Sequence, residues 1–228
     1  MFTRLLLGAG LLSSLLYAFM LAFVPQLWEG YSSSGQMVSE LSAIGAPTRQ
    51  LWVSFGVVYA MFVMAFGWGV IRWSAGKSRA LGIAGFLLAV YGAIVLFWPP
   101  MHLRGMELTQ TDSLHVAFTV AAVLLILLAI GFAAAKPGKW FRLYSFVTMV
   151  ALLVFGTLAG TAAPRLSAGL PTPGMGVWER FYTGAFLLWI AVLSVILLLS
   201  PEEEADGSTP EVQEEESRRS EPEPAGFL

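Results

Sequence analysis

The sequence predicts an all-α membrane protein, a bundle of six transmembrane helices with a disordered acidic C-terminal tail. Six uncharged apolar runs of about 18–22 residues fill most of the chain, at residues 5–24, 51–71, 80–98, 114–135, 143–161 and 181–199. A helix of ~20 residues spans a hydrocarbon core of ~30 Å and satisfies its own backbone polar groups there. Apolar residues are 57% of the chain and the mean hydropathy is +0.71, which indicates that lipid surrounds the apolar faces.

The first run, 5–24, is too long for the apolar region of a signal peptide, and no A-x-A-like cleavage site follows it. We therefore expect an uncleaved helix. In the loop that follows, Val38, Leu41 and Ile44 have a spacing of three, which predicts a short helix lying in the membrane interface. Pro47 and Thr48 predict the start of the second helix, because proline is tolerated in a first turn.

The later runs are joined by loops of two kinds. The connections at 72–79 and 136–142 are short and basic, whereas the loops at 25–50, 99–113 and 162–180 are longer. Long loops without secondary structure of their own are uncommon unless they are functional, so we expect any chemistry at the long loops.

Two glycine and proline patterns add local detail. Gly156 and Gly160 form a GxxxG pattern in the fifth run, which predicts close helix packing within the bundle, with a dimer seam as the alternative. The sequence Pro-Thr-Pro-Gly at 171–174 predicts a turn, and Pro201 prevents the sixth helix from extending.

Charge divides the chain into two parts. Residues 201–228 carry ten acids and two arginines and few apolar side chains, which predicts a disordered cytoplasmic tail beside a membrane domain of residues 1–200. The remaining chain has eleven Lys or Arg and five acids. The absence of cysteine excludes disulfides and cysteine-based metal or redox chemistry.

The basic residues predict the orientation. Seven lie at the N-terminus and in the short loops, and four lie in the long loops. By the positive-inside rule, we expect a multi-pass protein of the cell membrane with both termini in the cytoplasm and the long loops outside. Tryptophans flank the runs on both sides, as an aromatic belt requires: Trp28, Trp52, Trp98 and Trp178 outside, Trp73 and Trp140 inside.

Ionisable residues avoid the centres of the runs, which argues against a proton-coupled pump or a charge-lined channel. They gather instead in and beside the long loops: Glu40, Arg49, His102, Arg104, Asp112, His115, Glu179 and Arg180. We expect these side chains to share an outward-facing pocket between the starts of the second, fourth and sixth helices. Three helix N-termini and the arginines there suit an anionic group such as a lipid phosphate.

Structural roles are the alternative for the same residues. Asp112 suits the N-cap of the fourth helix, and Glu179 suits the first turn of the sixth. In the pocket hypothesis, Glu179 pairs with Arg49 or Arg104, and Asp112 either caps its helix or binds His115. His102, His115 and Asp112 are weak candidates for a divalent metal site, because their spacing matches no strong ligand motif.

Five stretches of the chain resemble the bacterial and archaeal membrane family called domain of unknown function 998. They are SELSAIGAPTR at 39–49, PPMHLRG at 99–105 with TDSLH at 111–115, and LPTP at 170–173 with WER at 178–180. The resemblance covers about residues 2–199 and implies a six-helix integral membrane protein. The family brings no established activity, but its motifs coincide with the polar residues of the long loops.

The sequence thus favours binding or sensing of a small ligand or lipid headgroup at the outer face. The alternatives are a membrane-embedded hydrolase of lipid or amide bonds, whose metal would activate water, and a structural or assembly protein. The expected partners are the lipid bilayer and a lipid or small-molecule ligand, without nucleic acid.

Overall fold

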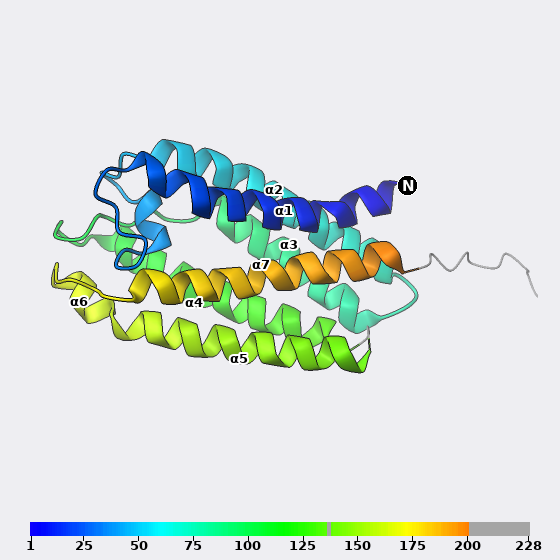
Figure 1. The fold of residues 1–228 in the computed structure, drawn as a ribbon. Coiled ribbons are helices and arrows are strands. Elements are labelled where there is room, and N and C mark those ends of the chain that lie inside the picture. Colours follow the sequence, from blue (N-terminus) through cyan, green and yellow to red (C-terminus); the bar gives the residue numbers. More distant parts are fainter. Residues whose placement is uncertain (136–137, 201–228) are drawn as a thin grey trace, which may run out of the picture.

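The computed structural model describes residues 1–135 and 138–200, and within them it has six helices long and apolar enough to cross a membrane (Figure 1). They are α1 (Phe2–Phe23), α2 (Arg49–Ser74), α3 (Arg79–Leu96), α4 (Gln110–Ala133), α5 (Lys139–Thr161) and α7 (Met175–Leu199). The predicted all-α fold of a multi-pass membrane protein is confirmed. The predicted disordered tail at 201–228 lies outside the described residues.

The two ends of the bundle differ. One end, which we call the long-loop end, carries the connections 24–48, 97–109 and 162–174, with the 3₁₀ helices η1 (Val24–Leu27) and η2 (Val38–Ser42) and the short helix α6 (Ala163–Ser167). The other, the short-loop end, carries the N-terminus and the turn between α2 and α3 (Figure 1). Helices α2, α4 and α7 all begin at the long-loop end, as the sequence predicts.

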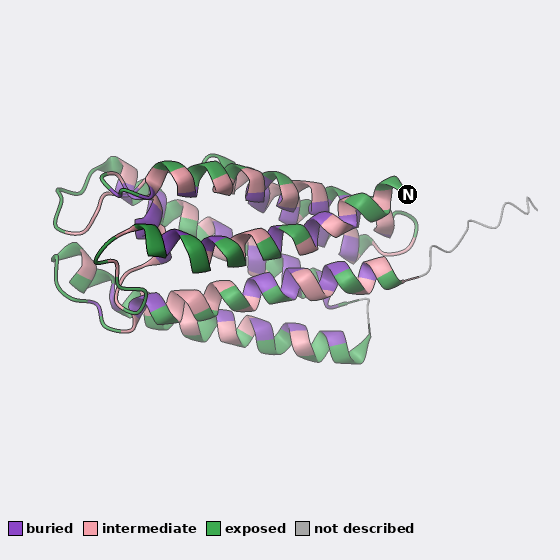
Figure 2. Cartoon of the chain, turned by 45° about the horizontal axis from the view of Figure 1, so that its top comes forward, coloured by how far each residue is buried: buried purple, intermediate pink, exposed green. Residues whose placement is uncertain are grey.

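The helices do not pack in the order of the sequence. Going round the bundle, each helix contacts the next in the order α4, α3, α2, α1, α7 and α5, so α7 lies between α1 and α5. Helices α4 and α5 make few direct contacts although only residues 134–138 separate them in the sequence. Buried residues are concentrated on the sides of the helices that face into the bundle (Figure 2).

Small residues and hydroxyl groups hold neighbouring helices together. A Cβ on Gly67 of α2 would lie 2.6 Å from the carbonyl oxygen of Gly85 in α3, so only glycine permits this approach. Between α1 and α7, Ser14 donates to the Leu187 carbonyl at 2.8 Å and Ser194 donates to the Leu7 carbonyl at 2.7 Å. Interhelical hydrogen bonds of this kind replace the hydrophobic force that lipid does not supply between helices.

The GxxxG pattern in α5 does not mark the close approach that the sequence predicts. A Cβ on Gly156 would meet Tyr182 of α7 at an ordinary 3.5 Å, and one on Gly160 would meet nothing within 4 Å. The close approaches lie at other glycines because α5 packs on α7 through larger side chains, including a stacked Phe155–Phe181 pair.

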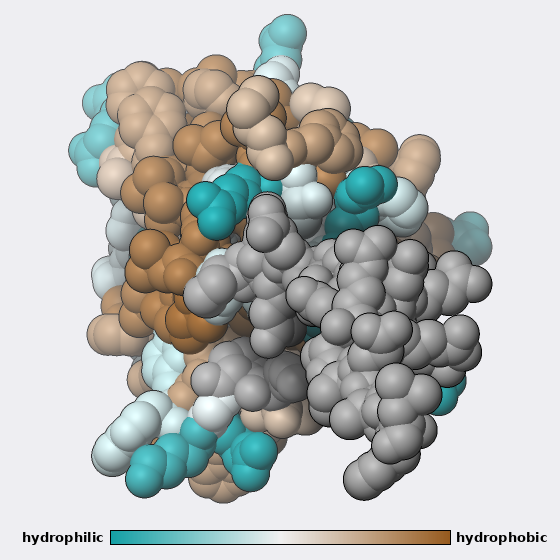
Figure 3. Space-filling view, turned by 90° about the vertical axis from the view of Figure 1, so that its right-hand side faces the viewer, coloured by the Kyte–Doolittle hydropathy of each residue, from teal (hydrophilic) through white to brown (hydrophobic). Residues whose placement is uncertain are grey.

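The short-loop end presents cations next to aromatic rings. Lys77 Nζ lies 4.9 Å from the ring centroid of Trp73, and Lys139 Nζ lies 5.8 Å from that of Trp140. Figure 3 looks onto this end and shows hydrophilic residues dispersed among apolar ones. Tryptophan with nearby lysine is the usual composition of a membrane–water boundary.

The predicted interfacial helix is a 3₁₀ helix that is buried rather than laid on the membrane surface. Val38 and Leu41 of η2 pack against Met20, Val24 and Trp52 of the neighbouring elements and are almost fully buried. Ile44 lies beyond η2, where its N–H donates to the Met101 carbonyl at 2.7 Å. The spacing of three predicts the apolar stripe, but it does not distinguish a lipid surface from a protein one.

Candidate functional site

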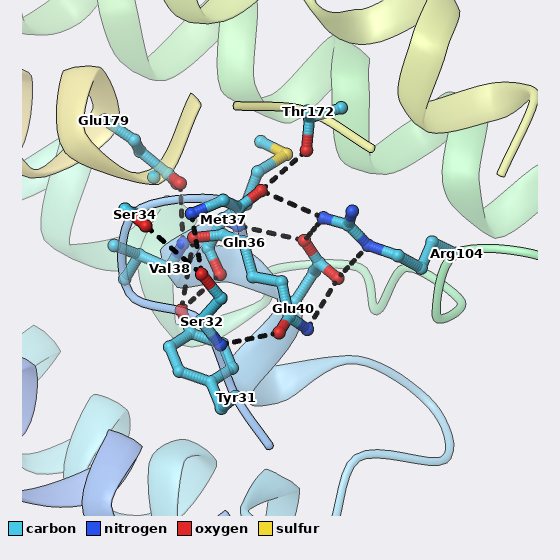
Figure 4. A network of polar contacts seen from close by, with 12 residues as sticks. Tyr31, Ser32, Ser34, Gln36, Met37, Val38, Glu40, Arg104, Thr172 and Glu179 are labelled. Atoms are coloured by element: carbon cyan, nitrogen blue, oxygen red, sulfur yellow. Dashed lines mark hydrogen bonds and ion pairs between the residues drawn. The ribbon is translucent and has the colours of Figure 1, made fainter. Parts of the chain in front are cut away.

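The long-loop end is linked by an ion pair between two different loops. Glu40, in η2, is fully buried, and its carboxylate accepts hydrogen bonds from Nε and Nη2 of Arg104, the first at 2.9 Å (Figure 4). The Met37 N–H and the Gln36 amide also donate to this carboxylate, at 2.9 and 3.3 Å. A buried charge requires this kind of pairing, and the hydrogen bonds with Glu40 raise the pKa of Arg104.

Glu179 does not pair with Arg49 or Arg104, so that prediction is wrong. It accepts a hydrogen bond from the Val38 N–H at 2.6 Å and a further one from the Ser39 backbone (Figure 4). These are the first N–H groups of η2, which have no partner within their own helix. Glu179 therefore caps η2 from a different helix. It does not lie in the first turn of its own helix, as predicted, because α7 begins at Met175.

Arg180, the next residue of α7, holds the loop before η2. Its Nη1 donates to the carbonyl oxygens of Ser33 at 2.7 Å, Gly176 at 3.0 Å and Gln36 at 3.3 Å. Its Nη2 donates to the Tyr31 hydroxyl, which in turn donates to the Met37 carbonyl at 2.8 Å. Burial raises the pKa of Tyr31 to about 12, so the phenol stays a donor at neutral pH.

Residues on both sides of η2 complete the attachment of this loop. Thr172 donates to the Gly35 carbonyl at 2.6 Å, and the Gly176 N–H donates to the Ser34 carbonyl at 3.1 Å. At the other end of η2, Thr48 and Arg49 donate to the carbonyls of Leu41 and Ser42 at 2.8 and 2.6 Å. Arg49 thus donates to a loop carbonyl rather than to an acid.

A second group of contacts lies where the 97–109 loop meets α4. Asp112 accepts from the backbone N–H groups of His102 and Thr109, at 2.7 and 2.8 Å, and lies 2.8 Å from Nδ1 of the His102 ring. Thr109 is the N-cap of α4 and Asp112 completes its capping box. Asp112 therefore does cap α4, but from the third position of the helix rather than as the predicted N-cap, and the histidine that it binds is His102.

His115 has different partners. Its Nδ1 lies 2.8 Å from the Pro99 carbonyl oxygen and 3.1 Å from the Trp98 indole nitrogen. A proton on Nδ1 donates to the Pro99 carbonyl, and that nitrogen then cannot accept from the Trp98 N–H. The metal hypothesis therefore finds only His102 and Asp112 together. Among residues 1–135 and 138–200, no three His, Cys, Asp or Glu side chains are grouped to hold a metal ion.

The eight predicted residues thus meet at one end of the bundle, mostly in contact with loop backbone. The acids bind N–H groups at helix starts, and Arg49 and Arg180 bind carbonyl oxygens. A single cavity shared by all eight stays a prediction. Tyr31, Thr109 and Gly176 also hold this end together, although they are not among the predicted residues. Only Thr109 has a signal, because threonine three residues before an acid is a capping-box pattern.

Two side-chain nitrogens at the long-loop end are free to bind a ligand. Nε2 of His102 and Nη1 of Arg104 have no hydrogen-bond partner among the described residues, and neither atom is sealed from the surroundings. Both side chains are only partly exposed, at 16% and 24%. Each is held by a buried or nearly buried carboxylate, and both come from the same loop.

Comparison with known proteins agrees with the resemblance in the sequence. No curated protein and no solved structure matches the chain. A family model described as "Protein of unknown function (DUF998)" matches residues 11–196, which include every residue of the candidate site. The chain therefore belongs to the DUF998 family of membrane proteins of unknown function.

Proposed function

We propose that the protein binds a small anionic ligand or a lipid headgroup at its long-loop end, facing the outside of the cell membrane. The observation that carries this proposal is the pair of oriented side chains His102 and Arg104. Each is locked by an acid from another segment, Asp112 or Glu40, and each keeps a free nitrogen. Such locking reduces the entropy lost when a ligand binds.

The chemistry of the two free nitrogens suits phosphate oxygens. The guanidinium of Arg104 stays protonated, so its Nη1 can donate to any phosphate oxygen. Nε2 of His102 donates when the ring is protonated and accepts from a P–OH group when the ring is neutral. The Asp112 carboxylate on Nδ1 fixes the ring so that Nε2 points away from the loop contacts. A free phosphate and a phospholipid headgroup share this chemistry.

The test measures binding of two probes to the full chain in dodecyl maltoside: inorganic phosphate and a short-chain phosphatidic acid. His102→Asn keeps a polar group near the position of Nδ1 and removes the free Nε2, and Arg165→Gln removes an exposed cation at the same end, as a control. We expect His102→Asn to weaken binding about tenfold, as loss of a charge-assisted hydrogen bond does, and the control to leave it unchanged.

The two probes separate the ligand classes. Binding of phosphate alone identifies a soluble anion, and binding only of the phosphatidic acid identifies a lipid. Equal affinities of the His102→Asn protein and the Arg165→Gln protein for both probes would overturn the proposal.

A further inference from the structure

Helices α4 and α5 make few contacts with each other, and their residues are mostly exposed in the half next to the long-loop end. There α4 packs through a single stripe that includes Asp112, His115 and Phe118, with His115 and Phe118 against Trp98 beyond α3. Helix α5 packs through one stripe against α7, and no residue of α5 after Leu152 is buried. Neither helix has a second stripe with which to cover the other, so this side faces lipid.

Polar side chains lie inside the same half of the bundle. The hydroxyls of Tyr59 in α2 and Tyr91 in α3 are 3.3 Å apart, and the ring of Tyr17 in α1 contacts that of Tyr59 with centroids 4.8 Å apart. Tyr182 lies three residues after Glu179 on α7, beside Gly156 of α5. Four helices thus direct tyrosines toward one region.

Three of these groups have unused hydrogen-bonding capacity. The hydroxyls of Tyr17 and Tyr182 have no hydrogen-bond partner among the described residues, yet neither is sealed off, and both residues are only half-buried. The charge of Glu179 acts on both hydroxyls. Its carboxylate accepts two backbone N–H groups, which leaves about half of its four lone-pair positions free.

We propose that this region binds the ammonium end of an amphiphile, whose hydrocarbon chain leaves the bundle between α4 and α5. A single carboxylate next to several tyrosine rings is the arrangement that recognises organic cations, through charge and through the ring faces. The opening toward lipid fits a hydrocarbon chain, which a soluble cation would not need. This site uses Glu179 and the tyrosines, so it does not depend on His102 or Arg104.

The test measures binding of two probes to the full chain in dodecyl maltoside at pH 8: dodecyltrimethylammonium and tetramethylammonium. Glu179→Gln removes the charge and keeps an oxygen that can accept the Val38 N–H, so η2 stays capped. Glu107→Gln is the matched control, because Glu107 is an exposed acid at the same end. We expect Glu179→Gln to weaken binding of the long-chain probe at least about tenfold and Glu107→Gln to leave it unchanged.

A second probe tests the role of the hydrocarbon chain, and a tyrosine variant tests the role of one hydroxyl. Tetramethylammonium should bind at least about tenfold more weakly than the long-chain probe, because it gains nothing from burial between α4 and α5. Tyr182→Phe keeps the ring and removes one hydroxyl, and we expect it to retain most of the binding. Equal affinity of the Glu179→Gln and Glu107→Gln proteins for dodecyltrimethylammonium would overturn the cation site, and equal affinity for the two probes would overturn entry between the helices.

Discussion

Glu40 joins the 24–48 loop to the 97–109 loop at the long-loop end. Its carboxylate is fully buried, whereas its partner Arg104 still reaches water. We expect Glu40→Gln to lower the free energy of unfolding by about 2 kcal/mol, less than for a fully buried pair, because water can partly solvate the cation left behind. Unfolding in mixed SDS and dodecyl maltoside micelles measures this, with Glu107→Gln as a control within about 0.5 kcal/mol. Equal losses in both variants would show that the pair does not hold the loops.

Tyr31 makes the stability of the long-loop end sensitive to alkaline pH. The pKa of its phenol is about 12 in the fold and about 10 in an unfolded chain, because burial disfavours the phenolate. Since the folded pKa is the higher one, the free energy of unfolding has its full value below about pH 10 and falls as the pH rises toward 12. We expect thermal unfolding in detergent to show this loss in the natural protein and a smaller one in Tyr31→Phe. Identical pH profiles of the two proteins would contradict this role.

At the scale of elements, the attachment of the 31–37 loop to the start of α7 requires a glycine. A Cβ on Gly176 would lie 2.2 Å from the Gln36 carbonyl oxygen and 2.5 Å from that of Ser33, distances that no side chain allows. We expect Gly176→Ala to destabilise the protein by about 2 kcal/mol or more, because the loop must move. Gly184→Ala in the same helix has open space around it and should change stability by less than about 1 kcal/mol in the same assay. Similar values for both variants would contradict the packing described.

Contacts within an element can be predicted from the sequence, whereas contacts between distant elements cannot. Apolar length alone predicts the six helices, and local chemistry predicts the capping by Asp112, whose partner Thr109 is three residues away. The partner of Glu40 lies 64 residues along the chain, and no local pattern distinguishes Arg104 from Arg49. Glu179 caps a different helix from its own for the same reason, since a capping acid fits any free N–H group that the fold brings near.

For the whole molecule, the arrangement of the helices decides which side chains can meet. Because α7 inserts between α1 and α5, Glu179 and Arg180 reach the loop before η2, and α5 stays apart from α4. Apolar runs without internal charges carry no information about neighbours, so this order could not be predicted. The orientation of the bundle in the membrane stays a prediction, made from the basic residues and loop lengths that differ between the two ends.

The claim that the long-loop end faces the outside of the cell can be tested directly, because the chain has no natural cysteine. Met106→Cys places a thiol on the long-loop end, and Lys139→Cys places one at the short-loop end, both at exposed positions. A maleimide that does not cross membranes should label the Met106→Cys protein on intact cells and the Lys139→Cys protein only after lysis. Labelling of the Lys139→Cys protein on intact cells, with the Met106→Cys protein protected until lysis, would contradict an outward-facing binding site.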